Sequence, residues 1–186
     1  MSVELLKRDY DLSNMQLIDL LILVMVTSGI CGFIYELFFY RIDLGYFVKR
    51  GSSFGPWIPI YAFGGLAYAI LVYRFKDNPV LVFFLCVIVS GTLEYVTGWV
   101  LYNVFDTRLW DYNTEIWNFG NIGGFVCLRS VLVFGLAGLM LIYAVIPTLA
   151  GLVKRFDPVI TNKVCLTLGA VFALDCILYQ IMKLKS

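Results

Sequence analysis

Long apolar stretches constrain this chain more than any other feature of its sequence. Five stretches, each close to the roughly 20 residues that span the hydrocarbon core of a bilayer, cover residues 15–40, 57–73, 79–102, 122–146 and 158–182. Hydrophobic residues make up 61% of the sequence and charged residues only 15%, which is too apolar a balance for one small soluble core to bury. The sequence therefore predicts an all-α, polytopic integral membrane protein of about five transmembrane helices.

The chain divides into a polar amino-terminal segment, residues 1–14, and a single transmembrane helical domain, residues 15–186. The first segment lacks the basic start, apolar stretch and small-residue cleavage site of a signal peptide, so we expect the first helix to stay in the mature protein. Asn78-Pro79 and Asp157-Pro158 each place a capping side chain before a proline suited to the first helical position. These two pairs predict where the third and fifth helices begin.

Composition also argues against several kinds of chemistry. The sequence has no histidine, and its five cysteines lie in apolar stretches without a CxxC pair, which disfavours a metal site and any Ser-His or Cys-His nucleophile. Lys plus Arg number 14 against 13 Asp plus Glu, so there is no basic footprint for nucleic acid. We predict a protein that is not an enzyme and uses no cofactor, metal or nucleic-acid partner.

The two longer connections, residues 41–56 and 103–121, should share one face of the membrane because successive helices alternate in direction. The second connection contains Trp110, Tyr112, Trp117 and Phe119, which are costly to expose together. We expect it to pack over the membrane domain, although any single Trp is also typical of an interface anchor. The amino terminus is predicted inside, because the positive charges of the two short turns lie near helix ends.

The charged residues of the apolar stretches include Glu36, Glu94, Arg129 and Asp175. At about 1.5 Å per residue, Arg129 should lie roughly 10 Å from the face that carries the longer connections, with Glu94 and Asp175 roughly 12–14 Å deep. The four side chains are therefore expected to meet in one layer. A lone Arg at that depth is unfavourable, so we expect Arg129 to pair with Glu94. Asp175 is the second choice and Glu36 the third.

This charged layer has two interpretations, and the sequence leaves both open. The first is structural: the ion pairs fix the register of the helices, and nearby glycines allow the helices to approach closely. The second is functional: the charges line a polar cavity that receives a charged or zwitterionic ligand.

Several ordered motifs resemble a known family. They are Gly51 with Gly55-Pro56-x-x-Pro59-Ile60-Tyr61, Leu93-Glu94-Tyr95-x-Thr97-Gly98, Trp110-Asp111-Tyr112, Asn118 and Cys127-Leu128-x-Ser130. From about residue 28 to residue 175, the chain resembles the bacterial family of ABC-transporter type IV membrane proteins. It departs from the family pattern at Asn103, where the family has a second Glu, and at Ala62, where the family has Gly.

The resemblance implies a permease-like, multi-pass component of the bacterial plasma membrane that carries a small charged or zwitterionic substrate. Membrane lipid would surround it, and a separate ATPase subunit would drive it, because the chain has no GxxxxGK[ST] motif. Five helices make a thin pathway, so we expect a homo-oligomer or a larger membrane complex. The predicted substrate-binding residues, none of them catalytic, are Glu36, Glu94, Trp110, Asp111, Tyr112, Asn118, Arg129 and Asp175.

Two alternative functions remain. One is an intramembrane enzyme that acts on a lipid headgroup, with Glu94 or Asp175 as general base and Arg129 holding the phosphate. The other is a structural or sensory membrane subunit in which the ion pairs only specify assembly.

Overall fold

The regular elements of residues 2–183, which the computed structural model describes, are all helices. Four helices are long and apolar enough to cross a membrane: α2 (Asn14–Leu44), α4 (Pro79–Phe105), the continuous helix Leu128–Arg155 and α7 (Pro158–Lys183). The chain is thus an all-α, polytopic membrane protein, as the sequence predicted.

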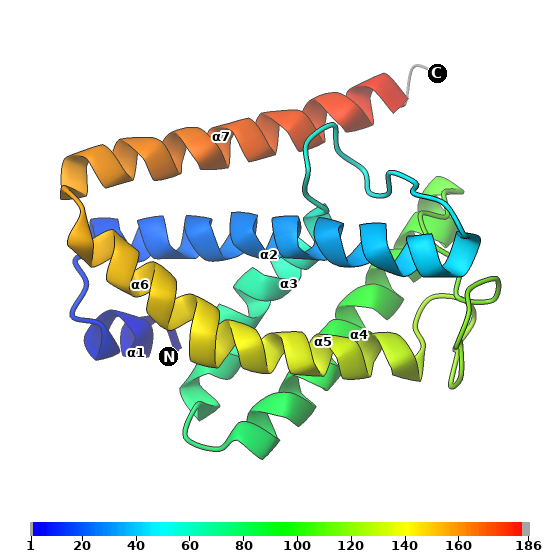
Figure 1. The fold of residues 1–186 in the computed structure, drawn as a ribbon, viewed down its shortest axis with the longest axis horizontal. Helices are drawn as coiled ribbons and strands as arrows, with labels where there is room; N and C mark the ends of the chain where they lie inside the picture. The colour runs from blue at the N-terminus through cyan, green and yellow to red at the C-terminus, as the bar shows by residue number, and fades with distance from the viewer. Residues whose placement is uncertain (1, 184–186) are drawn as a thin grey trace.

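The second expected span is a shorter apolar helix, Pro59–Phe75. It consists of α3 (Pro59–Ala67), the π-helix η1 (Tyr68–Val72) and the 3₁₀-helix η2 (Tyr73–Phe75). At about 1.5 Å per residue it is about 25 Å long, slightly less than the hydrocarbon core of a typical bilayer. It begins beside the middle of α2, where the Ile58 N–H donates to the Gly29 carbonyl at 3.1 Å, and runs toward the end that carries α1 (Figure 1).

The helix expected over residues 122–146 begins later than predicted. The continuous helix consists of α5 (Leu128–Met140), the π-helix η3 (Leu141–Val145) and α6 (Ile146–Arg155). Ahead of it the chain makes a tight turn, in which the Ile122 N–H donates to the Val126 carbonyl at 2.9 Å. Gly123 and Gly124 have φ angles of 61° and 78°, which are outside the helical range. The predicted boundary was wrong because hydropathy does not distinguish this apolar turn from helix.

The predicted starts of the third and fifth helices are confirmed. Helix α4 begins at Pro79 after an Asn78 side chain that accepts from the Leu81 N–H at 3.0 Å. Helix α7 begins at Pro158, where the Asp157 carboxylate accepts from the N–H groups of Val159 and Ile160. These bonds satisfy backbone donors that every helix start leaves free.

Helices α2 and α7 and the helix Leu128–Arg155 lie roughly along one direction (Figure 1). Helices α2 and α7 lie side by side and run the same way, whereas Leu128–Arg155 runs back, and α3 and α4 cross behind them. Residues 106–127 lie at the end where α2 finishes, and residues 45–58 begin at that end and run back to the middle of α2. The two longer connections therefore share one face, as expected.

Apolar packing is densest at the opposite end. There the short helix α1 (Ser2–Asp9) buries Leu6 completely against a cluster that also includes Tyr73 and Ile146. Near the middle, α2 and α3 approach closely because position 32 is glycine. A Cβ on Gly32 would lie 2.2 Å from the Tyr61 ring, so the small residue lets this ring reach the interior.

Candidate functional site

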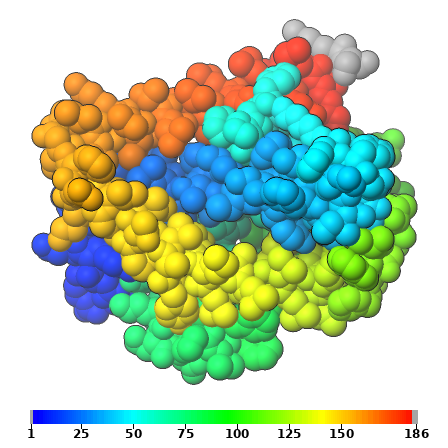
Figure 2. All heavy atoms as spheres, in the orientation of Figure 1, coloured from blue at the N-terminus to red at the C-terminus, as the bar shows by residue number. Residues whose placement is uncertain are grey.

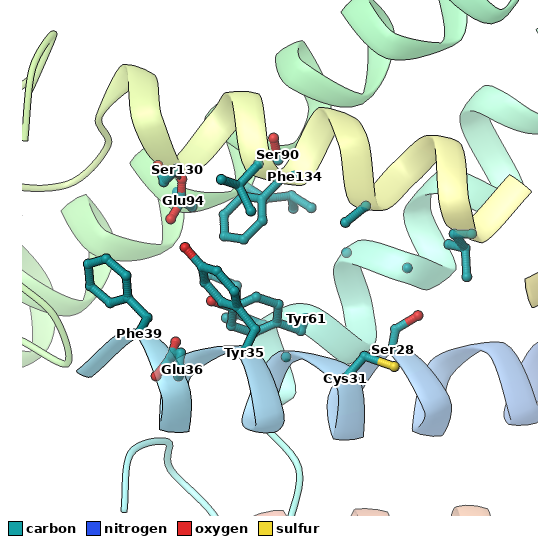
Figure 3. Close-up of a pocket in the computed structure, with 18 of the residues that line it drawn as sticks. Ser28, Cys31, Tyr35, Glu36, Phe39, Tyr61, Ser90, Glu94, Ser130 and Phe134 are labelled. Carbon is teal, nitrogen blue, oxygen red and sulfur yellow. Dashed lines mark hydrogen bonds between the residues drawn. The ribbon is translucent and has the colours of Figure 1, made fainter. Parts of the chain in front are cut away.

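A cavity of about 260 Å³ lies between α2, α3, α4 and α5 (Figure 3). The connection formed by residues 106–127, hereafter the cover segment, contributes Trp110, Tyr112 and Glu115 to its lining. Most of the remaining wall is apolar or aromatic. The charged residues of the wall are Glu36, Glu94, Glu115 and Arg129.

Glu94 projects from α4 and is held by two hydroxyl groups. The Ser130 hydroxyl donates to Glu94 Oε2 at 2.9 Å, and the Tyr112 hydroxyl donates to Oε1. Glu94 is only 6% exposed. Burial, followed by the Glu94 charge, raises the pKa of Tyr112 well above its usual value, so this phenol stays a hydrogen-bond donor at physiological pH.

Arg129 is the second residue of α5 and pairs with Glu115 of the cover segment. Its Nη2 lies 2.7 Å from Glu115 Oε2, and the Tyr40 hydroxyl donates to the other oxygen of the same carboxylate. The guanidinium also lies over the Phe39 ring, 4.1 Å from its centroid. The Arg129 and Glu115 side chains are only 10% and 5% exposed, so this is a buried ion pair.

The cover segment is fastened to α2 and α4 as well as to α5. Asp43, near the end of α2, accepts from the Ile116 N–H at 3.0 Å. The Trp110 indole donates to the Phe125 carbonyl at 2.9 Å and lies against α4 at Gly98, where a Cβ would be 3.1 Å from the indole. The segment therefore closes one end of the cavity.

Asp175 does not belong to the cavity. Its carboxylate accepts from the backbone N–H groups of Phe54 and Gly55 at 3.2 and 3.1 Å, and from the Trp57 indole at 2.7 Å. Asp175 thereby ties α7 to the loop of residues 45–58, which leads into α3.

The structure corrects the predicted charged layer in two ways. Glu36, Glu94 and Arg129 do line one cavity, but Asp175 contacts the loop instead. Arg129 is paired with Glu115 and not with Glu94, our first choice. Since α5 begins at Leu128, Arg129 lies in the first turn and not roughly 10 Å into the helix.

The predicted residues of the cover segment have different places. Tyr112 and Trp110 line the cavity. Asp111 pairs with Arg108 at 2.5 Å outside it, and Asn118 donates to the Asn113 carbonyl at 3.4 Å. These last two residues shape the segment.

The expectation that all four aromatic residues of the segment pack inward was partly wrong. Trp117 and Phe119 are 60% and 54% exposed. Exposed aromatic side chains at this end of the molecule are typical of anchors at the headgroup level.

Sequence reasoning missed Glu115, Tyr35 and Tyr61. Glu115 is the nearest acidic residue before Arg129 in the chain. Because the helix was predicted to begin at residue 122, Arg129 was placed too deep to contact a residue of the preceding connection. Tyr61 belongs to the Pro59-Ile60-Tyr61 motif, which could have indicated it, whereas Tyr35 carried no signal because Tyr is common in apolar stretches near interfaces. Within residues 2–183 no group of three acidic or cysteine side chains gathers as metal ligands would.

A family model described as "Putative ABC-transporter type IV" matches residues 23–179. The chain belongs to this family. The match extends over α2, α3, α4, α5 and most of α7, so it contains the whole cavity and the cover segment. No curated protein and no solved structure matches the chain. Membership makes this a transporter-related, multi-pass membrane protein.

Proposed function

We propose that this chain is the permease-like component of an ABC-type transporter in a bacterial plasma membrane, and that its cavity binds a small charged or zwitterionic substrate. The observation that carries the proposal is a cavity walled by four helices with charged side chains inside the membrane domain. Intramembrane charges are unfavourable unless they are paired or serve a pathway. Transporters commonly place such sites between helices, away from either water face.

The proposal requires a second subunit. The sequence contains no GxxxxGK[ST] motif, which is the loop that cradles ATP phosphates in P-loop ATPases. A separate ATPase would supply the energy, and assembly into a homo-oligomer or a larger membrane complex would widen the pathway.

Purification from the native membrane tests the proposal. The full-length chain, tagged and extracted in a mild detergent, should copurify with a P-loop ATPase whose ATP hydrolysis changes when the complex is reconstituted in liposomes. Glu94→Gln should alter that hydrolysis, whereas Asp106→Asn, an exposed acid at the end of α4, should not.

Two other results would contradict this function. Copurification with a lipid that the protein converts would favour the headgroup enzyme, for which Glu94 and Arg129 remain in one cavity but Asp175 does not. Copurification with another membrane protein, without any ATPase, would favour a structural or sensory subunit.

A further inference from the structure

The cavity opens sideways, between two membrane-crossing helices. Three of its lining residues are exposed: Cys31 near the middle of α2, and Ala137 and Met140 near the end of α5. The surface is hollowed between these helices (Figure 2), where atoms of α3 are visible below. At mid-length the surroundings of a transmembrane helix are acyl chains. The mouth therefore faces lipid.

Acidic side chains outnumber basic ones in the wall of the cavity. Within residues 2–183 neither Glu36 nor Glu94 forms an ion pair. The guanidinium of Arg129 is already paired with Glu115 at 2.7 Å. Arg50 lies near Glu36, but it is held by the Tyr40 hydroxyl at 3.1 Å and the Leu109 carbonyl at 3.0 Å.

Even when Arg50 is counted with the cavity, three glutamates face two arginines. A positive ligand would provide a partner for the remaining glutamate, because a nearby cation strongly favours the ionised form of a buried carboxyl group.

Aromatic rings lie between the two carboxylates (Figure 3). Tyr35, Tyr61 and Phe134 pack together, with centroids 6.3 Å apart for Tyr35 and Tyr61 and 5.2 Å apart for Tyr61 and Phe134. The faces of such rings attract organic cations and also offer apolar surface. An anionic ligand would meet the Glu36 and Glu94 carboxylates instead.

We propose that the cavity binds a small organic cation with an apolar body, and that this ligand enters from the bilayer between α2 and α5. The inference rests on the proposed function in that it treats the cavity as the substrate site, and it names the class of substrate. The cavity volume of about 260 Å³ suits a ligand of one ring with a short ammonium arm, since a cavity of about 150 Å³ is enough for benzene.

Three probes with the same ring and different charges test the ligand class: benzylammonium, benzyl alcohol and benzoate. Each is titrated calorimetrically into the full-length protein in nanodiscs, and the alkylation of Cys31 is followed by peptide mass spectrometry. We expect benzylammonium to bind at least about tenfold more tightly than the other two probes, and to slow the alkylation of Cys31.

Benzoate is the critical competitor, because the buried Nε of Arg129 has no hydrogen-bond partner within residues 2–183. Tighter binding of benzoate, equal binding of benzyl alcohol, or no binding by any probe would each overturn the proposal. These wild-type comparisons need no variant to fold.

Variants then locate the charge that attracts the probe. Glu36→Gln and Glu94→Gln should each weaken benzylammonium binding about tenfold and leave benzyl alcohol unchanged. Asp106→Asn is the matched control and should change neither. Size-exclusion chromatography checks that both glutamine variants are folded. If both folded variants bind benzylammonium as tightly as the wild type, the two glutamates do not attract the ligand and the proposal is refuted.

Lateral entry is tested with a fluorophore on Cys31, after Cys176→Ser removes the partly exposed cysteine of α7. A nitroxide at the middle of a lipid acyl chain should quench this fluorophore more strongly than aqueous iodide. The same fluorophore on Phe119→Cys in the cover segment, with Cys31→Ser, should show the reverse order. Stronger quenching by iodide at Cys31 would show a water-facing mouth and would overturn entry from lipid.

These tests separate the inference from the proposed function. Selective ammonium binding in a protein that copurifies with no ATPase would keep the ligand class and reject the transporter role. An ATPase complex that depends on Glu94 but ignores benzylammonium would keep the transporter role and reject the ligand class.

Discussion

Arg129 has one ion-pair partner among the described residues, Glu115, and both side chains are buried. Removing one member of a buried pair leaves an uncompensated charge, which costs about 3 kcal/mol or more. Arg129→Gln should therefore lower the free energy of unfolding by about 3 kcal/mol.

Arg108→Gln is the matched control for this prediction. Arg108 pairs with Asp111 at 2.5 Å, but both side chains are 28% exposed, so its loss should cost at most about 1 kcal/mol. Thermal unfolding in detergent, followed by circular dichroism, gives both values. Equal losses would mean that the Arg129 pair contributes no more than a surface ion pair.

Asp9 gives the protein a dependence on pH at the α1 end. Burial tends to raise the pKa of Asp9, but hydrogen bonds from Lys76 and Tyr73 outweigh it and lower the pKa below its usual value. A carboxylate whose folded pKa is lowered stabilises the protein above its unfolded pKa of about 3.9 and loses that contribution as the pH falls through the folded value.

Asp9→Asn should accordingly lower the melting temperature at pH 7 and have progressively less effect below about pH 4. Asp11→Asn is the control, because the Asp11 side chain is 98% exposed and lies 3.7 Å from Lys154. Melting curves from pH 3 to pH 7 provide the measurement. An Asp9→Asn difference that stays constant over this range would contradict the assignment.

Helix α7 holds the loop of residues 45–58 in place through hydrogen bonds to Asp175. Because Asn offers a single acceptor oxygen, Asp175→Asn cannot keep all three hydrogen bonds to Phe54, Gly55 and Trp57. We expect trypsin to cut after Lys49 about tenfold faster in this variant, since bonds to a charged acceptor contribute about 1.5–3 kcal/mol each.

The cover segment supplies an internal control for the same digestion. Arg108 is held by Asp111 and by the Gly123 carbonyl at 2.9 Å, so cleavage after Arg108 should be slow in wild type and in Asp175→Asn alike. Gln180→Ala, an exposed position on α7, should leave both cleavage rates unchanged. Rapid cleavage after Arg108 in the folded wild type would show that the cover segment is mobile.

For the whole molecule, the path of Pro59–Phe75 decides the topology. Residues 45–58 run from the end of α2 back to its middle, and this helix continues from there to the end that carries α1 (Figure 1). Five crossings then place reporters fused at Ser2 and after Ser186, which lies outside the described residues, on opposite sides of the membrane. Reporters on the same side would mean that the short helix does not cross.

The sequence predicted the helical class and most helix positions, because hydropathy and the Asn78 and Asp157 caps act locally. It predicted that charges gather inside, but it did not predict their pairs. The Arg129–Glu115 pair depends on how the cover segment folds back, and Glu115 lies in a connection without periodicity. The partners of Asp175 were not predicted either. Almost every residue has a backbone N–H group, so the sequence does not indicate which of these groups will donate to a given carboxylate.

The two π-helices bear on how sequences of this family should align. A π-helical turn bonds five residues back, and an α-helical turn bonds four, so η1 (Tyr68–Val72) and η3 (Leu141–Val145) each accommodate one additional residue. Deleting one residue there restores α-helical hydrogen bonding, and the side chains of both flanking helices keep their orientation. Elsewhere in a helix the same deletion rotates everything beyond it by about 100°. Family members that are one residue shorter should therefore carry their gap within residues 68–72 or 141–145.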